Sequence, residues 1–354
     1  MKKICLLTES RYKGGLDTFV KELIGNWPNS EDEFSFLANK SHPGMSDILN
    51  ALNTDANLFN LSTPYSKILD FIHSDSKQTK SVIVKKVLRA AYMVAYFPIF
   101  VPLCIIFLTI AFKRSAFDEL LVVNGGHPGS LACRLAPISW VLSGKKGNCI
   151  YNVHNSPVKF GTLRSIPEWF LDQGLVLFSS AIVTVSKSAY EDFKHCPNIY
   201  KSKKLSVVHN GISDPLETDK GLRGQYNGDS PKFCLMLSTF EARKGHKFLL
   251  NSFAAVLEEL PELKLQIHGQ GTCEETETIK NYIGELGLEN NVELNSFAKD
   301  PFEVLKDSYM LLAPSQEYES FGLTLLEAMA MKVPFIATSV GGMIEVGQHS
   351  CGGY

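Results

Sequence analysis

The sequence predicts an α/β protein with two domains, each built on its own parallel sheet. The chain has 354 residues, which is more than one hydrophobic core usually holds. Short apolar runs alternate with helical patterns in both halves, and most runs are continuously apolar, as is typical of strands covered by helices on both faces. Asn-Gly, Pro and clustered Gly at residues 209–231 indicate a hinge between the halves.

The first half, residues 1–208, contains five predicted strands. The run at residues 4–7 is followed by a turn with Gly14 and Gly15 and then by apolar residues at helical spacing from Phe19 to Ile24. The other strands are expected at residues 120–123, 149–153, 181–185 and 205–208.

The second half, residues 232–354, repeats this order. Strands are expected at residues 233–237, 263–267, 309–313 and 333–337. Between the first two, Leu250, Phe253, Ala254 and Leu257 follow the i, i+3, i+4, i+7 spacing of an amphipathic helix. Because open parallel sheets bind ligands at the carboxyl ends of their strands, we expect the site in a cleft between the two domains.

Residues 90–112 carry no charge and lie between Lys/Arg clusters. One helix of that length would be about 34 Å long, enough to span a bilayer. A single crossing would separate the strands near Ile4 and Leu120, which should share a sheet. The alternatives are a re-entrant or surface-lying membrane segment, a buried core helix, or a groove for a protein partner. The first predicts peripheral contact with the cytoplasmic face of a membrane.

Composition excludes several other classes of protein. The formal net charge is −2, which argues against nucleic-acid binding. The 8 Cys are scattered without C-x-x-C pairs, so we expect neither a disulfide framework nor a structural zinc site. Free thiols of this kind are typical of a protein in the reducing cytoplasm. No Asp-x-Asp pair is present, and we predict no metal and no bound cofactor.

Two motifs follow predicted strands of the second half. Residues 319–323 (ESFGL) open a helix whose first amides, at Phe321, Gly322 and Leu323, suit an anion. Glu319 and Glu327 flank this helix start and suit sugar or ribose hydroxyls.

The other motif, residues 238–245 (STFEARKG), places Arg243 and Lys244 after a strand, where they would neutralise a diphosphate. Each motif also has a plain structural interpretation, as a capped helix with an exposed Glu and as a solvated basic turn.

Together with Gly14-Gly15 and with residues 208–212 (VHNGI) at the hinge, these motifs resemble retaining GT-B glycosyltransferases of the family-four type, the glycosyl transferases group 1. The resemblance implies two Rossmann-like domains facing a cleft, and a sugar moved with retention from a nucleoside-diphosphate sugar to an acceptor hydroxyl. The acceptor would be a glycan or lipid-linked, in polysaccharide or glycolipid assembly. The carboxyl-terminal helices of the family are expected to be missing here.

The resemblance also implies roles for individual residues. Glu327 would bind the ribose, Glu319 and the amides of residues 321–323 the donor sugar and phosphate, and Lys244 the diphosphate. His127 would lie beside the reacting centre, and Gly15 and Gly269 would belong to donor-side loops. His127 and His154 are otherwise ordinary hydrogen-bonded histidines.

The chain departs from the family at Ser238-Thr239, where members usually have Gly-Arg, and Arg243 is expected to compensate. An inactive nucleotide-sugar-binding module and a nucleotide-sugar epimerase remain alternatives. A nicotinamide-dependent oxidoreductase is disfavoured because no G-x-G-x-x-G turn follows the first strand.

Overall fold

The computed structural model describes residues 1–10, 14–40, 42–51, 57–60, 87, 94–159, 162–215 and 233–349. The chain divides into two compact units, Met1–His209 and Asn210–Tyr354. Most of the predicted hinge, from residue 216 on, lies outside the described residues, as do residues 90–93 of the apolar segment.

The N-terminal unit contains a seven-stranded sheet in the order β3-β2-β1-β4-β5-β6-β7, in which all neighbouring strands are parallel. The strands are β1 (Lys3–Thr8), β2 (Glu33–Ala38), β3 (Asn57–Asn60), β4 (Glu119–Asn124), β5 (Cys149–Val153), β6 (Ala181–Thr184) and β7 (Leu205–Val207).

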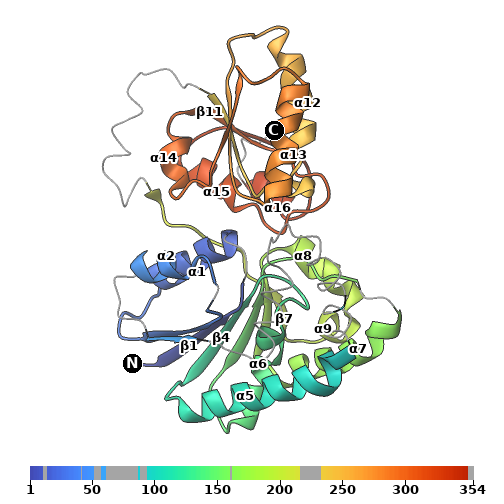
Figure 1. Cartoon of the computed structure of the whole chain (residues 1–354). Helices are drawn as coiled ribbons and strands as arrows, with labels where there is room; N and C mark the ends of the chain where they lie inside the picture. The colour runs from blue at the N-terminus through green and yellow to red at the C-terminus, as the bar shows by residue number, and fades with distance from the viewer. Residues whose placement is uncertain are drawn as a thin grey trace. The chain divides into compact units, whose positions relative to one another are not determined.

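Helices cover both faces of this sheet (Figure 1). Residues of β1 alternate between them: Leu6 packs with α1 and α2, whereas Cys5 and Leu7 belong to the larger core under α5, α6 and α7. This explains the continuously apolar run. The helices are α1 (Gly15–Gly25), α2 (Met45–Ala51), η1 (Tyr96–Phe100), α5 (Val101–Arg114), α6 (Leu131–Leu142), α7 (Thr162–Phe178), α8 (Lys187–Asp192), η2 (Phe193–His195) and α9 (Pro197–Tyr200).

The apolar segment forms η1, a π-helical turn, and α5. Its residues 96–114 are long and apolar enough to cross a membrane by length and composition. One side nevertheless packs into the core through Cys104, Leu108 and Phe112, while Ile106 and Ile110 on the opposite side are exposed. Because α5 leads into β4 and β4 pairs directly with β1, a single crossing would break this sheet. The buried side agrees with the core-helix interpretation, and contact of the exposed side with a membrane stays a prediction.

The C-terminal unit contains a five-stranded parallel sheet in the order β10-β9-β8-β11-β12. Helices α12 and α13 pack on one face through Leu250, Phe253, Ile279 and Ile283. The elements are β8 (Phe233–Leu237), η3 (Ala242–Lys244), α12 (His246–Leu257), β9 (Leu265–His268), α13 (Cys273–Glu285), β10 (Val292–Asn295), α14 (Pro301–Leu305), β11 (Ser308–Ala313), α15 (Leu323–Ala330), β12 (Phe335–Ala337) and α16 (Met343–His349).

All nine predicted strands are present, with bounds shifted by at most two residues. The strands that the apolar pattern did not predict are β2, β3 and β10. Two of them, β3 and β10, are four-residue edge strands, and β10 has a buried Val292 beside an exposed Glu293. An edge strand needs less apolar surface, so its pattern resembles that of a loop.

Candidate functional site

The basic turn after β8 is held by the loop that follows the neighbouring strand β11. Gly245 has φ 80°, and a β-carbon there would lie 2.0 Å from the carbonyl oxygen of Pro314. The amide of Gln316 donates to the carbonyl oxygen of Arg243 at 2.8 Å. Only glycine fits this left-handed, tightly packed position, so the turn has a defined place at the carboxyl edge of the sheet.

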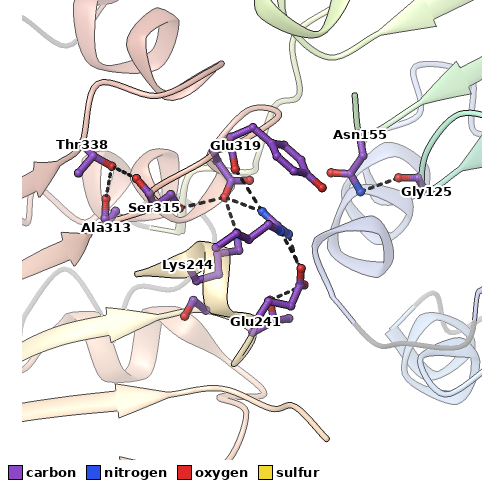
Figure 2. Close-up of polar contacts among 12 residues, drawn as sticks. Gly125, Asn155, Glu241, Lys244, Ala313, Ser315, Glu319 and Thr338 are labelled. Atoms are coloured by element: carbon purple, nitrogen blue, oxygen red, sulfur yellow. Dashed lines mark hydrogen bonds and ion pairs between the residues drawn. The ribbon is translucent and has the colours of Figure 1, made fainter. Parts of the chain in front are cut away.

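This arrangement brings Lys244 and Glu319 together, 75 residues apart in sequence, as a direct ion pair (Figure 2). Both side chains are about 15% exposed. The guanidinium of Arg243 lies 3.8 Å from the same carboxylate, and Ser315 Oγ donates to it at 3.5 Å. Two cations and one carboxylate therefore meet at the ends of β8 and β11, with partial access to solvent.

Arg243 is oriented by two further residues, Glu241 and Tyr318. Its Nε donates to Glu241 Oε2 at 2.6 Å, and its guanidinium lies 4.8 Å from the ring centre of Tyr318. Thr239 Oγ1 donates to the other oxygen of Glu241 at 2.9 Å. Burial opposes ionisation of Glu241, but the bond and charge of Arg243, the bond from Thr239 and the charge of Lys244 together outweigh it and lower the pKa of this carboxyl. Through Glu241, Thr239 thus helps to position Arg243, the residue expected to replace the arginine that family members usually have at position 239.

The 319–323 loop is packed against glycines that follow β12. A β-carbon on Gly341 would lie 2.2 Å from the carbonyl oxygen of Glu319, and the amide of Gly342 donates to that oxygen at 2.7 Å. Gly322 caps α15 with φ 95°, and the helix begins at Leu323, next to the predicted start. Phe321 is buried.

Glu327 lies on the buried side of α15, with 6% of its surface exposed. A Glu with a purely solvating role would be exposed, so the plain interpretation of this position is wrong. A buried carboxylate requires partners, which is consistent with a residue that contributes to a binding site.

Gly269 lies at the end of β9, where a β-carbon would be 1.9 Å from the carbonyl oxygen of Ser238. This close approach packs the loops after β8 and β9 against each other. Ser238 Oγ lies 3.1 Å from His246 Nε2, and burial together with Lys244 lowers the pKa of His246 to about 4. His246 is therefore neutral near pH 7 and adds no charge to the basic turn.

In the N-terminal unit, Gly15 begins α1 directly after β1 and its turn. The preceding Gly14 donates its amide to Asp17 Oδ2 at 2.9 Å. This places Gly15 at the carboxyl edge of the sheet, where the resemblance expects a donor-side loop.

His127 lies beyond the end of β4 and is only 1% exposed. Its Nε2 lies 3.0 Å from Asp172 Oδ1 on α7, and its Nδ1 has no hydrogen-bond partner among the described residues. Burial lowers the pKa of the imidazole, although Asp172 acts in the opposite direction. The neutral ring then carries its proton on Nε2, toward the carboxylate, and leaves Nδ1 as an acceptor.

Arg134 on α6 completes this network. It pairs with Glu168 and donates through Nη2 to Asp172 at 2.6 Å. Burial works against ionisation of Asp172, but His127 and Arg134 outweigh it, and the pKa of this carboxyl is lowered. Sequence reasoning missed these three residues because no local pattern connects Arg134 with partners 34 and 38 residues away.

His127, Asp172 and Cys196 place one potential metal-ligand atom each within 4.8 Å of one another. Two observations disfavour a metal at this group. The guanidinium of Arg134 already supplies a positive charge to Asp172, and burial raises the pKa of the Cys196 thiol to about 12, whereas metals bind the thiolate. The group fits a hydrogen-bond network better.

His154 is buried beside Phe19, with ring centres 4.3 Å apart. Burial lowers its pKa to about 3, so it is a neutral core residue. The predicted residues therefore fall into two groups. Arg243, Lys244, Gly269, Glu319, Phe321, Gly322, Leu323 and Glu327 lie in the C-terminal unit, and Gly15 and His127 lie in the N-terminal unit.

Comparison with known proteins agrees with this architecture. Residues 222–354 match the family model described as glycosyl transferases group 1. A 167-residue stretch is 35% identical to mannosylfructose-phosphate synthase of Agrobacterium fabrum, covering 42% of this chain and 36% of that protein. A 180-residue stretch is 32% identical to N-acetyl-alpha-D-glucosaminyl L-malate synthase of Bacillus anthracis, covering 50% and 46%. The matched region spans less than half the length of either relative.

Among solved structures, the chain is similar to HepE of Anabaena in complex with UDP and glucose. The TM-score is 0.67 at 15% identity, and the match covers 98% of this chain and 83% of that one. At this identity the likeness establishes the fold, which is two parallel-sheet domains of the GT-B type.

Proposed function

Because residues 222–354 match the family model of the glycosyl transferases group 1 and the chain has the GT-B fold, we propose that this protein is a retaining glycosyltransferase. It would move a sugar from a nucleoside diphosphate to an acceptor hydroxyl. The observation that carries the proposal is the meeting of Arg243, Lys244 and Glu319 at the ends of β8 and β11. Two cations that would bind a diphosphate therefore lie beside a carboxylate that would bind sugar hydroxyls.

Donor binding would exchange partners at this cluster. Lys244 would leave Glu319 for the diphosphate oxygens, and the released carboxylate would accept hydrogen bonds from the donor sugar. Arg243 lies close enough to follow, since its guanidinium is 3.8 Å from Glu319. The buried Glu327 would bind the ribose hydroxyls, and the amides of residues 321–323 would contact sugar and phosphate.

In the transfer step, the bond from the anomeric carbon to the diphosphate oxygen breaks and the bond to the acceptor oxygen forms on the same face. The departing phosphate oxygen takes the acceptor proton, so the step needs no protein base. Lys244 and Arg243, rather than a metal ion, would stabilise the leaving diphosphate, and electrostatic stabilisation of this kind is usually the largest catalytic contribution.

His127 would act as a hydrogen-bond acceptor for a donor-sugar hydroxyl. Its Nδ1 has no partner among the described residues, and its Nε2 is held by Asp172. A neutral imidazole suits this role because a charged one would repel the forming oxocarbenium-like sugar. Gly15 and Gly269 would allow their loops to approach the donor closely.

The acceptor is proposed to be a glycan or a lipid-linked saccharide in surface polysaccharide or glycolipid assembly. This rests on the apolar segment, whose exposed side would keep the protein on the cytoplasmic face of a membrane where such acceptors lie.

A panel of nucleoside-diphosphate sugars, tested by thermal shift, examines the donor site directly. The cognate donor should raise the unfolding temperature of the native chain, because a ligand at about 100 times its Kd stabilises by about 2.7 kcal/mol. Lys244→Ala and Glu327→Ala should lose most of this shift. Lys247→Ala is the matched control, since Lys247 is exposed on α12 over the Tyr282 ring.

No shift with any donor, or an equal shift in Lys244→Ala, would contradict the proposal. The same samples distinguish the alternatives by product. A binding module would stabilise with the donor and leave it intact with every acceptor. An epimerase would convert the donor sugar without an acceptor.

A further inference from the structure

Two helices on the same face of the N-terminal sheet expose apolar stripes to solvent. The exposed residues follow the spacing i, i+4, i+7, i+11 on the first helix and i, i+3, i+4, i+11 on the second, so each set forms one side of its helix. We call them the α5–α7 face: Ile99, Leu103, Ile106 and Ile110 from η1 and α5, and Ile166, Trp169, Phe170 and Leu177 from α7.

The stripes point the same way because both helices pack against one sheet face. The inner sides of α5 and α7 share a core with α6, through residues such as Leu108, Trp140 and Leu175. Helix α6 lies between them and is mostly buried, and Figure 1 shows all three helices on one side of the sheet. The outer sides of α5 and α7 therefore border the same solvent region.

Helices α5, α6 and α7 bring no acidic side chain to this face. Helices α5, α6 and α7 contain only two acidic residues, Glu168 and Asp172. Both lie on the inner side of α7, where they are buried against Arg134. The turn of α7 that directs Glu168 inward directs Trp169 and Phe170 outward.

Exposed basic residues line one edge of the unit beside the face. They precede three strands of the parallel sheet, so they share its amino edge: Lys113 and Arg114 before β4, Lys146 before β5, and Lys201 and Lys203 before β7. Three helices whose described outer sides carry no acidic group, bordered on this edge by five cations and the exposed Asp118, match a bilayer that contains anionic lipids.

We propose that the α5–α7 face docks in the plane of an anionic lipid bilayer, with Trp169 and Phe170 entering the interfacial region. This refines the membrane contact within the proposed function, and adds α7 to the segment that the sequence indicated. The protein lies on the membrane and does not span it, because the inner side of α5 belongs to the core.

Vesicle sedimentation tests this inference. The full chain should bind phosphatidylcholine vesicles that contain phosphatidylglycerol, and bind pure phosphatidylcholine vesicles much less. The double variants Ile99→Ser/Ile106→Ser and Trp169→Ser/Phe170→Ser should each weaken binding at least about tenfold. Lys113→Glu/Arg114→Glu should weaken it about fivefold or more per residue on the anionic vesicles.

The matched control is Val256→Ser/Leu260→Ser, which removes exposed apolar side chains from the C-terminal unit and should bind as the native chain does. Binding that both α5–α7 double variants retain would overturn the inference. So would a native chain that remains unbound, or one that forms a dimer through this face instead. Donor thermal shift on the same samples reports separately on the proposed transferase, since vesicle binding does not require donor binding.

A second measurement does not depend on serine variants that fold. Vesicles with brominated acyl chains should quench the exposed Trp169, while Trp140 is buried in the core. Trp169→Phe keeps an aromatic ring at this position and should keep vesicle binding, but lose most of the bromine quenching. Equal quenching of the native chain and Trp169→Phe would place Trp169 outside the bilayer and refute its proposed insertion.

Discussion

In the N-terminal unit, Arg134, Glu168 and Asp172 form a charged cluster whose side chains are 0%, 1% and 8% exposed. In the C-terminal unit, Lys244, Arg243 and Glu319 form a cluster of the same charge types at 15–16% exposure. Both clusters join residues that are distant in sequence, yet their surroundings differ. The first is closed by helices α6 and α7, and the second lies at the carboxyl edge of its sheet.

This difference indicates what each cluster can do. A buried ion pair cannot exchange partners without leaving a charge unsolvated, which costs several kcal/mol. The half-buried pair can be separated when a ligand supplies another anion. The first cluster is therefore suited to holding α6, α7 and His127 in place, and the second to binding a substrate.

The largest effect is expected from Arg134→Met. Removing the guanidinium leaves Glu168 and Asp172 buried without their cation, and should lower the free energy of unfolding of the N-terminal unit by about 3–5 kcal/mol. Arg243→Met, the matched change in the partly exposed cluster, should cost about 1 kcal/mol or less. Urea unfolding measures the free energy of unfolding of both variants. Equal losses of stability would mean that the two clusters do not differ in the way proposed.

The next effect concerns the backbone that positions Lys244. Gly245→Ala places a β-carbon on a residue with φ 80° and 2.0 Å from the Pro314 carbonyl oxygen, which should destabilise the C-terminal unit by at least about 2 kcal/mol. Gly284→Ala, in helix α13 where a β-carbon would lie 3.5 Å from Glu289 Oε1, should be neutral or slightly stabilising. Thermal unfolding compares the two, and an unchanged Gly245→Ala would mean that the turn is loosely held.

A third effect depends on pH. Folded His154 has a pKa of about 3 because it is buried, whereas an unfolded histidine titrates near 6.5. Between these values the unfolded chain binds the additional proton, so the free energy of unfolding falls as the pH falls, by about 2 kcal/mol from this residue at pH 5.

His154→Phe should remove that part of the pH dependence. Its stability relative to the native chain should improve on going from pH 7 to pH 5, as measured by denaturant unfolding at each pH. His195→Gln, at an exposed position, is the control and should follow the native profile. A parallel profile for His154→Phe would show that burial does not keep His154 neutral.

The smallest expected effect tests whether Lys244 exchanges Glu319 for a ligand. Glu319→Gln removes the carboxylate that holds Lys244, so free nucleoside diphosphate should bind about three- to tenfold more tightly, as isothermal titration would show. Sugar transfer should fall in the same variant, because the donor sugar loses its acceptor for hydrogen bonds. Weaker diphosphate binding would mean that the ion pair does not compete with the ligand.

Much of the fold was predictable because central parallel strands are buried on both faces. Each central run, such as Cys5–Leu7 in β1, had to be apolar throughout, and the helix around Leu250 and Phe253 had to carry its apolar side at helical spacing. The edge strand β10 was not predicted because only Val292 of its residues is buried.

The site was predictable only where its residues share short motifs. Spacing was sufficient to propose residues 319–327 and the Arg243-Lys244 turn. The Lys244–Glu319 pair depends on β8 and β11 being neighbours, and the Asp172 contact of His127 depends on α7 lying beside the end of β4. Burial also altered expectations, since His127 is almost completely enclosed.

The amino-acid order therefore specified the number of sheets, the central strands other than β2, and the chemical character of the candidate residues, because hydrophobic periodicity and short motifs are local properties. The packing of distant elements decided which charges meet, which of them water reaches, and that helix α5 has one side in the core and one side exposed. These outcomes depend on contacts between segments tens of residues apart, and no local pattern encodes them.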